Sequence, residues 1–252
     1  MNSENIIIKD SDLVFTIITP VYNEVESLPH FHEQLMKVIN KLNIKYEWII
    51  VDDLSNDSTN KIIKSIAEKN IHVHGIRLAK NYGSHIAITA GLHLANGDSA
   101  IVMAADLQDP PELIPEFLEK WEEGSKIVYG IREFREESWL NVKLRQLFYR
   151  LMYRLSDESI PLDAGDFRLV DRDVIELLAG INDRRPYLRG VIASFGFKQA
   201  GVPYRREKRV KGESKFPYRT MTKLAIDGLI NHSDVPLLSL IHISEPTRPR
   251  LI

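Results

Sequence analysis

Short runs of apolar, often β-branched residues alternate with longer amphipathic stretches along the first half of the chain. The apolar runs predict strands at Phe15–Thr19, Glu47–Val51, Val73–Arg77, Ala100–Ala104 and Lys126–Tyr129. The amphipathic stretches between them predict helices at Leu28–Leu42, Ser58–Lys69, Gly83–Ala95 and Pro111–Glu123. This alternation is typical of βαβ units, so the sequence predicts an α/β fold with a mostly parallel central sheet flanked by helices.

The regular alternation ends after Gly130. Glu137–Leu155 has the pattern of a long helix, with an apolar stripe and basic residues that lie largely off it. Two interpretations stay open for this segment: a helix packed on the core with a solvated basic face, or a basic amphipathic helix on an anionic membrane surface. Beyond it we expect a loop and short strand, a strand-rich piece and another helix, at Leu162–Asp171, Gly190–Arg206 and Pro217–Asn231.

Composition narrows the range of functions. The 252 residues are enough for one large domain, or for a core domain with an appendage. The balance of 33 Lys and Arg against 35 Asp and Glu argues against a protein that coats nucleic-acid phosphates along its length. The absence of Cys excludes a disulfide scaffold, a thiolate zinc site and a cysteine nucleophile. The first residues lack the apolar core of an export signal, and no run of about 18 apolar residues occurs.

Carboxylates follow two of the predicted strands. Asp52 and Asp53 come directly after the second strand, and Asp106 and Asp109 follow the fourth. Because ligands of open α/β sheets lie at the carboxyl ends of the strands, we expect these side chains near a site. Carboxylates there can accept hydrogen bonds from a base or ribose, or hold a hard divalent cation. One such aspartate alone is more often a helix cap or turn residue, but two clusters on one sheet favour a site.

The glycine-rich sequences of dinucleotide-binding and P-loop folds do not occur in the chain. Three other motifs follow the first, second and fourth strands: Ile18-Thr19-Pro20-Val21-Tyr22-Asn23-Glu24, Val51-Asp52-Asp53-x-Ser55-x-Asp57-x-Thr59 and Ala105-Asp106-Leu107-Gln108-Asp109-Pro110-Pro111-Glu112. Together they resemble family 2 glycosyltransferases of the GT-A nucleotide-diphospho-sugar transferase fold, and within them the polyisoprenyl-phosphate branch similar to dolichol-phosphate-mannose synthases. The resemblance covers residues 13–236 and implies a nucleotide-sugar-binding half (13–131) and an acceptor-side half (132–236).

The resemblance implies roles for residues in these motifs. A pocket for the base and ribose of a nucleotide sugar is expected from Pro20, Tyr22, Glu24 and Asp53. A site for Mg²⁺ or Mn²⁺ against the donor diphosphate is expected from Asp106 and Gln108.

Two positions depart from the family pattern. Many relatives read D-A-D-L-Q where this chain has Ala104-Ala105-Asp106-Leu107-Gln108, so one possible carboxylate is missing. Metal affinity is then expected to be lower, or Asp109 or a water completes the shell of the metal. Leu54 stands where a Gly is common, which bears on how tightly that turn can close.

The second half adds further matching pieces. Gly130-Ile131-Arg132 resembles the family's G-x-R, whose arginine reaches a phosphate. The stretch Asp163–Leu169 resembles the acceptor-side loop, and Asp166 within it is predicted as the catalytic carboxylate. The alternative for Asp166 is a buried turn aspartate paired with Arg168 or Arg172.

The segment Arg209–Lys215 resembles the R-x-x-G-x-S-K sequence that closes over diphosphate and lipid phosphate. Its expected phosphate-binding residues are Arg209, Ser214 and Lys215. A run of basic residues is usually a solvated face, but Gly212 and Ser214 favour a flexible anion-binding loop here.

The function implied by the resemblance is metal-dependent, inverting transfer of a sugar from a nucleotide diphosphate sugar to a polyprenyl phosphate. The acceptor oxygen is then already ionised, so Asp166 would orient it rather than deprotonate it. The implied partners are the donor, the lipid acceptor and the cytoplasmic face of a membrane, with no nucleic acid, and a homo-oligomer stays open. Two alternatives remain: a family 2 enzyme with a saccharide acceptor, and a nucleotide-sugar-binding module without turnover, the latter motivated by Ala104.

Residues 238–252 form an unusual tail. Its first part reads Leu-Ser-Leu-Ile-His-Ile-Ser-Glu-Pro-Thr-Arg, which resembles a translated sequencing adapter. We therefore expect the natural part of this sequence to end near Leu237, and a membrane anchor of the natural protein to be missing after it. The alternative is a genuine amphipathic tail. On the first interpretation the tail takes no part in the fold.

Overall fold

The computed structural model describes residues 14–42, 44–133, 164–181 and 188–205. The chain divides into two compact units, and every described residue belongs to the unit made of Met1–Phe134 and Asp163–Glu213. Four sequence predictions lie outside the described residues: the helices at Glu137–Leu155 and Pro217–Asn231, the basic loop at Arg209–Lys215 and the tail at 238–252.

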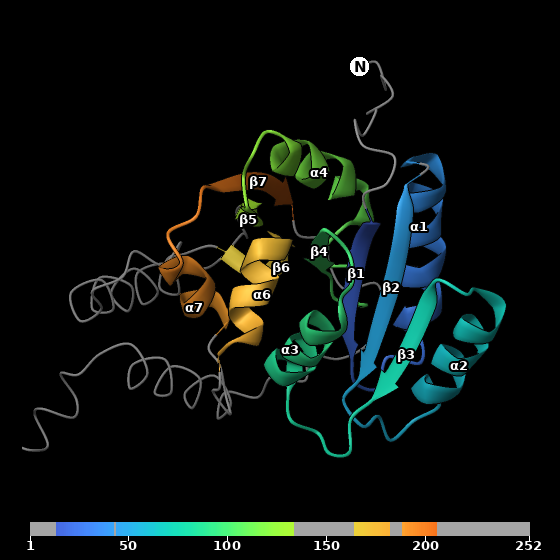
Figure 1. The fold of residues 1–252 in the computed structure, drawn as a ribbon. Coiled ribbons are helices and arrows are strands. Elements are labelled where there is room, and N and C mark those ends of the chain that lie inside the picture. The colour runs from blue at the N-terminus through green and yellow to red at the C-terminus, as the bar shows by residue number, and fades with distance from the viewer. Residues whose placement is uncertain (1–13, 43, 134–163, 182–187, 206–252) are drawn as a thin grey trace, which may run out of the picture. The chain divides into compact units, whose positions relative to one another are not determined.

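The described strands form one seven-stranded sheet (Figure 1). They are β1 (Val14–Val21), β2 (Lys45–Asp52), β3 (Val73–Arg77), β4 (Ser99–Val102), β5 (Ile127–Glu133), β6 (Ala164–Asp171) and β7 (Gln199–Arg205). Their order in the sheet is β3-β2-β1-β4-β6-β5-β7. Among these strands β6 alone runs against its neighbours, β4 and β5, while the other four pairs are parallel. The predicted α/β fold with a mostly parallel sheet is confirmed.

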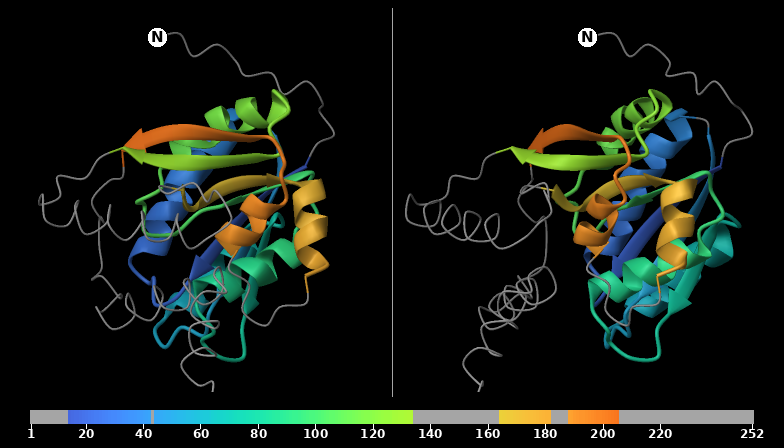
Figure 2. Two further views of the ribbon diagram at one scale, coloured as in Figure 1. Left: turned by 90° about the vertical axis from the view of Figure 1, so that its left-hand side faces the viewer. Right: turned by 60° about the vertical axis from the view of Figure 1, so that its left-hand side comes forward.

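Helices cover both faces of the sheet (Figure 1, Figure 2). One face carries α1 (Ser27–Leu42), α2 (Thr59–Lys69), and α4 (Ile114–Glu122) with the short 3₁₀ turn η1 (Pro111–Leu113) before it. The other face carries α3 (Ser84–Leu94), α6 (Arg172–Ala179) and α7 (Leu188–Ser194). Because both faces are buried, the central strands read as nearly continuous apolar runs in the sequence.

Strand β2 shows how alternate residues supply the two cores. Trp48 and Ile50 are buried on the α1 side, whereas Ile49 and Val51 are buried on the α3 side. Trp48 Nε1 also donates a hydrogen bond to Thr19 Oγ1 on β1 (2.9 Å). A slip of one residue would move every one of these side chains to the opposite face, so the burial pattern fixes the register of the strand.

The structure corrects the strand-rich piece predicted at Gly190–Arg206. This segment begins within helix α7, and strand β7 starts only at Gln199. Val191 and Ile192 are β-branched and suggested a strand. Leu188 and Ile192, however, lie four residues apart and are buried in the core shared with α6, which is the spacing of one helix face.

Strand β6 is longer than the short strand expected within Leu162–Asp171, and helix α6 follows it directly. Helix α6 is not among the predicted helices, although Val174, Ile175 and Leu178 have the spacing of one buried helix face. Asp171 begins this helix, because its carboxylate accepts a hydrogen bond from the backbone amide of Asp173 (3.0 Å). An aspartate at this position satisfies an amide that has no partner within the helix.

Candidate active site

The candidate site residues meet at one edge of the sheet. Strands β1 to β4 are mutually parallel, so the loops that follow them share an edge, and β5 and β7 end at the same edge. Strand β6 runs in the opposite direction and therefore begins there, with Gly165 and Asp166. The topology thus brings together the three motif loops, Arg132 near the end of β5, and Asp166.

One residue in each of the three motif loops has a left-handed backbone conformation. The φ angles are 54° at Asn23, 60° at Leu54 and 58° at Leu107. For a leucine this conformation costs roughly 1–2 kcal/mol, whereas asparagine adopts it more readily. Such strain concentrates at functional sites, where the surrounding structure enforces it. Leu54 therefore makes the turn that a Gly commonly makes, but with strain.

Side chains of the second motif hold the backbone of the first. Ser55 Oγ accepts a hydrogen bond from the amide of Asn23 (2.9 Å), and Thr59 Oγ1 accepts one from the amide of Glu24 (2.9 Å). Asn23 Oδ1 in turn accepts a hydrogen bond from the amide of Asn56 (2.8 Å). The Ser and Thr of the second motif therefore have a structural purpose, since their hydroxyl groups fix the loop after β1.

The residues predicted to form the nucleotide pocket lie along this edge: Pro20, Tyr22, Glu24 and Asp53. The first three are half-buried, whereas Asp53 is buried. Asp53 Oδ1 accepts a hydrogen bond from the amide of Tyr82 (2.8 Å), and Oδ2 accepts one from the amide of Gly83 (2.8 Å). Asp53 thus fixes the loop that leads into α3. Contact between these residues and a nucleotide stays a prediction.

The metal motif forms a tight loop after β4. Asp106 is 7% exposed, and its Oδ1 accepts a hydrogen bond from the amide of Gln108 (3.1 Å) across the left-handed Leu107. Within the described residues, no group of three or more His, Cys, Asp or Glu side chains could hold a metal ion. One carboxylate and one amide oxygen still suit Mg²⁺ or Mn²⁺, because these cations complete their shell with phosphate oxygens and water. The donor set fits a cation bound jointly with a diphosphate.

Asp109 is bound to Tyr204, a residue that the sequence motifs do not single out. Asp109 Oδ1 accepts a hydrogen bond from the Tyr204 hydroxyl (2.6 Å), which itself accepts one from Arg132 Nε (3.3 Å). The carboxylate that could compensate for Ala104 is therefore already engaged. Its partner lies 95 residues away along the chain, on β7, which is an edge strand of the sheet.

Asp166 forms a two-point ion pair with Arg189 of α7. Arg189 Nε lies 2.8 Å from Oδ1 and Nη2 lies 3.0 Å from Oδ2, and the two side chains are 32% and 34% exposed for Arg189 and Asp166. Partial burial raises the pKa of Asp166, but the pairing with Arg189 lowers it, as do the charges of Arg168 and of His85 when its ring is protonated in acid. The net pKa lies well below the usual range of a carboxyl group, so Asp166 is ionised at neutral pH.

The hydrogen-bond partner of Asp166 is thus neither of the two arginines that the sequence suggested. Arg168 Nη2 donates to the carbonyl oxygen of Gly165 (2.8 Å), and Arg172 donates to carbonyl oxygens of the loop before β4. Arg189 lies on the helix whose residues resembled a strand. If α7 had been predicted as a helix, Arg189 would have been placed on a helix next to the sheet and could have been considered as a partner of Asp166.

His85 lies at the start of α3, close enough to this ion pair for the charges to act on it. Burial lowers the pKa of His85, and Asp166 opposes this effect, whereas Arg189 and Arg168 add to it. The net pKa is below the ordinary value, so His85 is neutral at neutral pH. The surroundings of Asp166 therefore combine one carboxylate with two guanidinium groups, which favours the binding of an anion.

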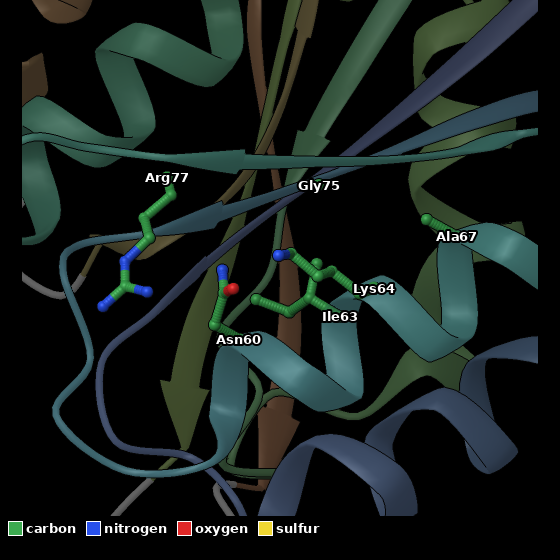
Figure 3. Close-up of a pocket in the computed structure, with 6 residues that line it drawn as sticks. All are labelled: Asn60, Ile63, Lys64, Ala67, Gly75 and Arg77. Atoms are coloured by element: carbon green, nitrogen blue, oxygen red, sulfur yellow. The ribbon is translucent and has the colours of Figure 1, made fainter.

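A pocket of about 340 Å³ lies between α2 and β3. Figure 3 shows its lining, which consists of Asn60, Ile63, Lys64, Ala67, Gly75 and Arg77. Arg77 Nη2 donates to the carbonyl oxygen of Ser55 (2.9 Å), and its Nε lies 3.4 Å from Asp52 Oδ2. The pocket contains none of the predicted site residues. Its arginine instead supports the turn after β2.

Comparison with known proteins identifies the family of the chain. Residues 16–178 match the model of the family described as Glycosyl transferase family 2. The chain belongs to glycosyltransferase family 2, as its three motifs indicated.

Several curated relatives cover most of the chain. The uncharacterized glycosyltransferase YkcC of Bacillus subtilis (strain 168) is 39% identical over 88% of this chain and 69% of its own length. The prophage bactoprenol glucosyl transferase homolog of Escherichia coli (strain K12) is 33% identical over 88% of this chain and 73% of its own length. The bactoprenol glucosyl transferase of Shigella phage SfV has the same identity and coverage.

Solved structures share the fold. The mannosyltransferase PcManGT from Pyrobaculum calidifontis, in complex with GDP-Man and Mn²⁺, superposes with a TM-score of 0.59 at 16% identity, over 89% of this chain and 64% of that one. Glucosyl-3-phosphoglycerate synthase from Mycobacterium tuberculosis, in complex with Mn²⁺ and UDP, gives 0.57 at 17% identity, over 87% of this chain and 80% of that one. At these identities the likeness establishes the fold, and the predicted GT-A fold is confirmed.

Proposed function

We propose that this glycosyltransferase moves a sugar from a nucleotide diphosphate sugar to a polyprenyl phosphate at the cytoplasmic face of a membrane. The observation that carries the proposal is the ion pair between Asp166 and Arg189. A saccharide acceptor attacks through a hydroxyl group, and a base with a pKa near the working pH is needed to remove its proton. The lowered pKa of Asp166 makes it a poor base, whereas a phosphate is already ionised and needs none.

In the proposed reaction, an oxygen of the acceptor phosphate attacks the anomeric carbon of the donor sugar. The bond from that carbon to the diphosphate oxygen breaks, and the nucleoside diphosphate leaves with the electron pair. The configuration at the anomeric carbon is inverted. Asp166 is proposed to orient the acceptor by holding Arg189, because an ionised carboxylate has no hydrogen to donate to a phosphate anion, and Arg189 and Arg168 balance the charge of that phosphate. No proton is transferred in this step.

The donor is proposed to lie across the motif loops. Its base and ribose would contact Pro20, Tyr22, Glu24 and Asp53. Asp106 and Gln108 would hold Mg²⁺ or Mn²⁺ together with the diphosphate, and such a cation neutralises charge that develops on the leaving group. Arg132 would add fixed positive charge for a phosphate oxygen.

The names of the relatives support a lipid acceptor, since several are bactoprenol glucosyl transferases at 33% identity.

Arg209, Ser214 and Lys215 lie outside the described residues and are proposed, from their motif, to bind phosphate oxygens. We also propose that residues 13–131 bind the nucleotide sugar and that residues 132–236 form the acceptor side. Within the described ranges, no helix combines the length and the apolar character needed to cross a membrane.

A transfer assay with matched acceptors tests the proposal. The donor is first chosen by thermal shift with a panel of nucleotide sugars, with and without Mn²⁺. The acceptors are a short-chain polyprenyl phosphate, the free polyprenol of the same chain, and an oligosaccharide. We expect product with the phosphate alone, because the free polyprenol offers the same chain but a hydroxyl that needs a base. Turnover of the free polyprenol or the oligosaccharide, with a rate that rises with pH, would overturn the choice of acceptor.

A further inference from the structure

The hydroxyl group of Tyr204 joins two parts of the candidate site that lie far apart in the sequence. It donates to Asp109 Oδ1 (2.6 Å) in the loop of the metal motif, and it accepts from Arg132 Nε (3.3 Å) of the G-x-R sequence. Arg132 and Tyr204 are register partners on the parallel strands β5 and β7, which lie side by side in Figure 2. A buried hydroxyl that bonds to a carboxylate and a guanidinium is a specific arrangement, since each bond fixes an orientation.

The ring of Tyr204 is held in place by close packing. The side chain is 4% exposed, and its ring meets the ring of Phe167 edge to face, with centroids 5.5 Å apart. At Gly130, a Cβ would lie 2.6 Å from Tyr204 Cε1 and 2.9 Å from Phe167 Cδ1. The glycine of the G-x-R sequence therefore makes room for this ring. Packing against Phe167 and Gly130 fixes the position of the ring and therefore of the hydroxyl.

The direction of the hydrogen bonds follows from the charges. A carboxylate can only accept a hydrogen bond, and a guanidinium can only donate one. The hydroxyl group of Tyr204 therefore donates its hydrogen bond to Asp109, and its oxygen accepts one from Arg132. The guanidinium of Arg132 also lies against the backbone of Gly165, where a Cβ would be 2.6 Å from Nη2. Arg132 is thus held between Tyr204 and the residue before Asp166.

We infer that Tyr204 is a positioning residue that couples Asp109 to Arg132 and so sets the orientation in which Arg132 binds a phosphate oxygen. This inference rests on the proposed function, because it takes Arg132 to be a phosphate ligand. The hydrogen bond from Nε constrains the plane of the guanidinium, and a planar guanidinium with a fixed orientation recognises phosphate better than a freely rotating one. The phosphate can belong to the donor diphosphate or to the lipid acceptor, and the experiment separates these two sources.

The test compares Tyr204→Phe with Tyr46→Phe. The first variant keeps the ring and removes the hydroxyl. The second removes a hydroxyl from a half-buried tyrosine that accepts a hydrogen bond from Asn70 Nδ2 (2.8 Å) at the start of β2, away from the site. Each protein is titrated with UDP and GDP in the presence of Mn²⁺ by calorimetry, and KM is measured for a short polyprenyl phosphate. We expect Tyr204→Phe to raise the Kd of the nucleoside diphosphate or the KM of the lipid phosphate about tenfold, and Tyr46→Phe to change neither.

A double-mutant cycle with Arg132→Gln then shows whether Tyr204 acts through Arg132. If it does, Tyr204→Phe adds no further loss of phosphate affinity in the Arg132→Gln background. Equal behaviour of the two Phe variants, or losses that multiply in the double variant, would overturn the inference. Wild-type protein that binds neither UDP nor GDP would instead count against the proposed donor. If Tyr204→Phe does not fold, the cycle uses the double variant Tyr204→Phe/Asp109→Asn in its place. Asp109→Asn removes the carboxylate that would otherwise be buried without the hydrogen bond from Tyr204.

Discussion

The backbone amide of Gly83 donates a hydrogen bond to Asp53 Oδ2 over 2.8 Å, although the two residues are 30 positions apart. The other carboxylate oxygen accepts the preceding amide, that of Tyr82. One buried side chain therefore fixes two consecutive amides of the loop that enters α3. Hydrogen bonds to a charged acceptor are stronger than neutral ones. The second motif thus shapes a neighbouring loop in addition to its own.

Asp53→Asn tests this relationship. An Asn side chain has one accepting oxygen, so one of the two amides loses its partner in a buried position. We expect the free energy of unfolding to fall by about 1–3 kcal/mol and the affinity for the preferred nucleoside diphosphate to decrease. Urea unfolding and calorimetry measure the two effects. The matched control is Asp173→Asn, a 59%-exposed carboxylate in the first turn of α6, which should change stability by about 0.5 kcal/mol or less and leave nucleotide affinity unchanged. Normal nucleotide affinity in Asp53→Asn would remove this loop from the nucleotide site.

Leu54→Gly should be more stable than Leu54→Ala, although both variants lose the same side-chain contacts. The φ angle of 60° strains a leucine, whereas glycine adopts it freely. Leu54→Ala is the control, since alanine loses the same contacts but keeps a Cβ in the left-handed conformation. We expect the Gly variant to exceed the Ala variant by about 1 kcal/mol in the free energy of unfolding. Equal stability of the two variants would show that the turn is not strained.

The sequence indicated the first half of the fold well because its signals there are local. Apolar runs mark strands such as β3, whose bounds match the prediction, and parallel strands necessarily place their following loops at one edge. The insertion of β6 between β4 and β5 has no local signal. That insertion, together with β7, brings Tyr204 to Asp109, and the helical character of α7 brings Arg189 to Asp166. The residues that complete the site are therefore partners in long-range contacts, and such contacts depend on strand order.

Asp106→Asn is expected to separate metal binding from folding. The Asn oxygen can still accept the hydrogen bond from the amide of Gln108, so the loop should keep its shape. The charge that would attract a divalent cation is lost. We expect a melting temperature near that of the wild type without metal, loss of the additional thermal shift that Mn²⁺ gives with the nucleotide sugar, and a fall in kcat of at least about 100-fold. An undiminished effect of Mn²⁺ would show that Asp106 is not a metal ligand.

The stability of the protein should fall in acid partly through Asp166. Its pKa in the folded protein lies below the value of about 3.9 expected in the unfolded chain. The unfolded state therefore takes up a proton first, and the stabilisation is fully present above about pH 5 and is lost as pH falls below about 4. Urea unfolding of wild type and Asp166→Asn from about pH 3 to 7 should show a difference that shrinks toward the acid end. Because the pair with Arg189 is about one third exposed, solvent screening limits the size of that difference.

Turnover distinguishes a catalytic Asp166 from one that only stabilises the fold. Asn keeps the size of the side chain but cannot form the ion pair, so a residue that orients the acceptor should lose kcat while the affinity for the donor stays near wild type. Wild-type kcat should also be independent of pH from about 6.5 to 8.5 as far as Asp166 is concerned, since its carboxylate is ionised throughout. Arg189→Lys is the companion variant: it keeps the positive charge but loses the two-point geometry, and it should raise the KM of the polyprenyl phosphate. A kcat of Asp166→Asn equal to that of the wild type at temperatures where both are folded would assign Asp166 a structural role alone.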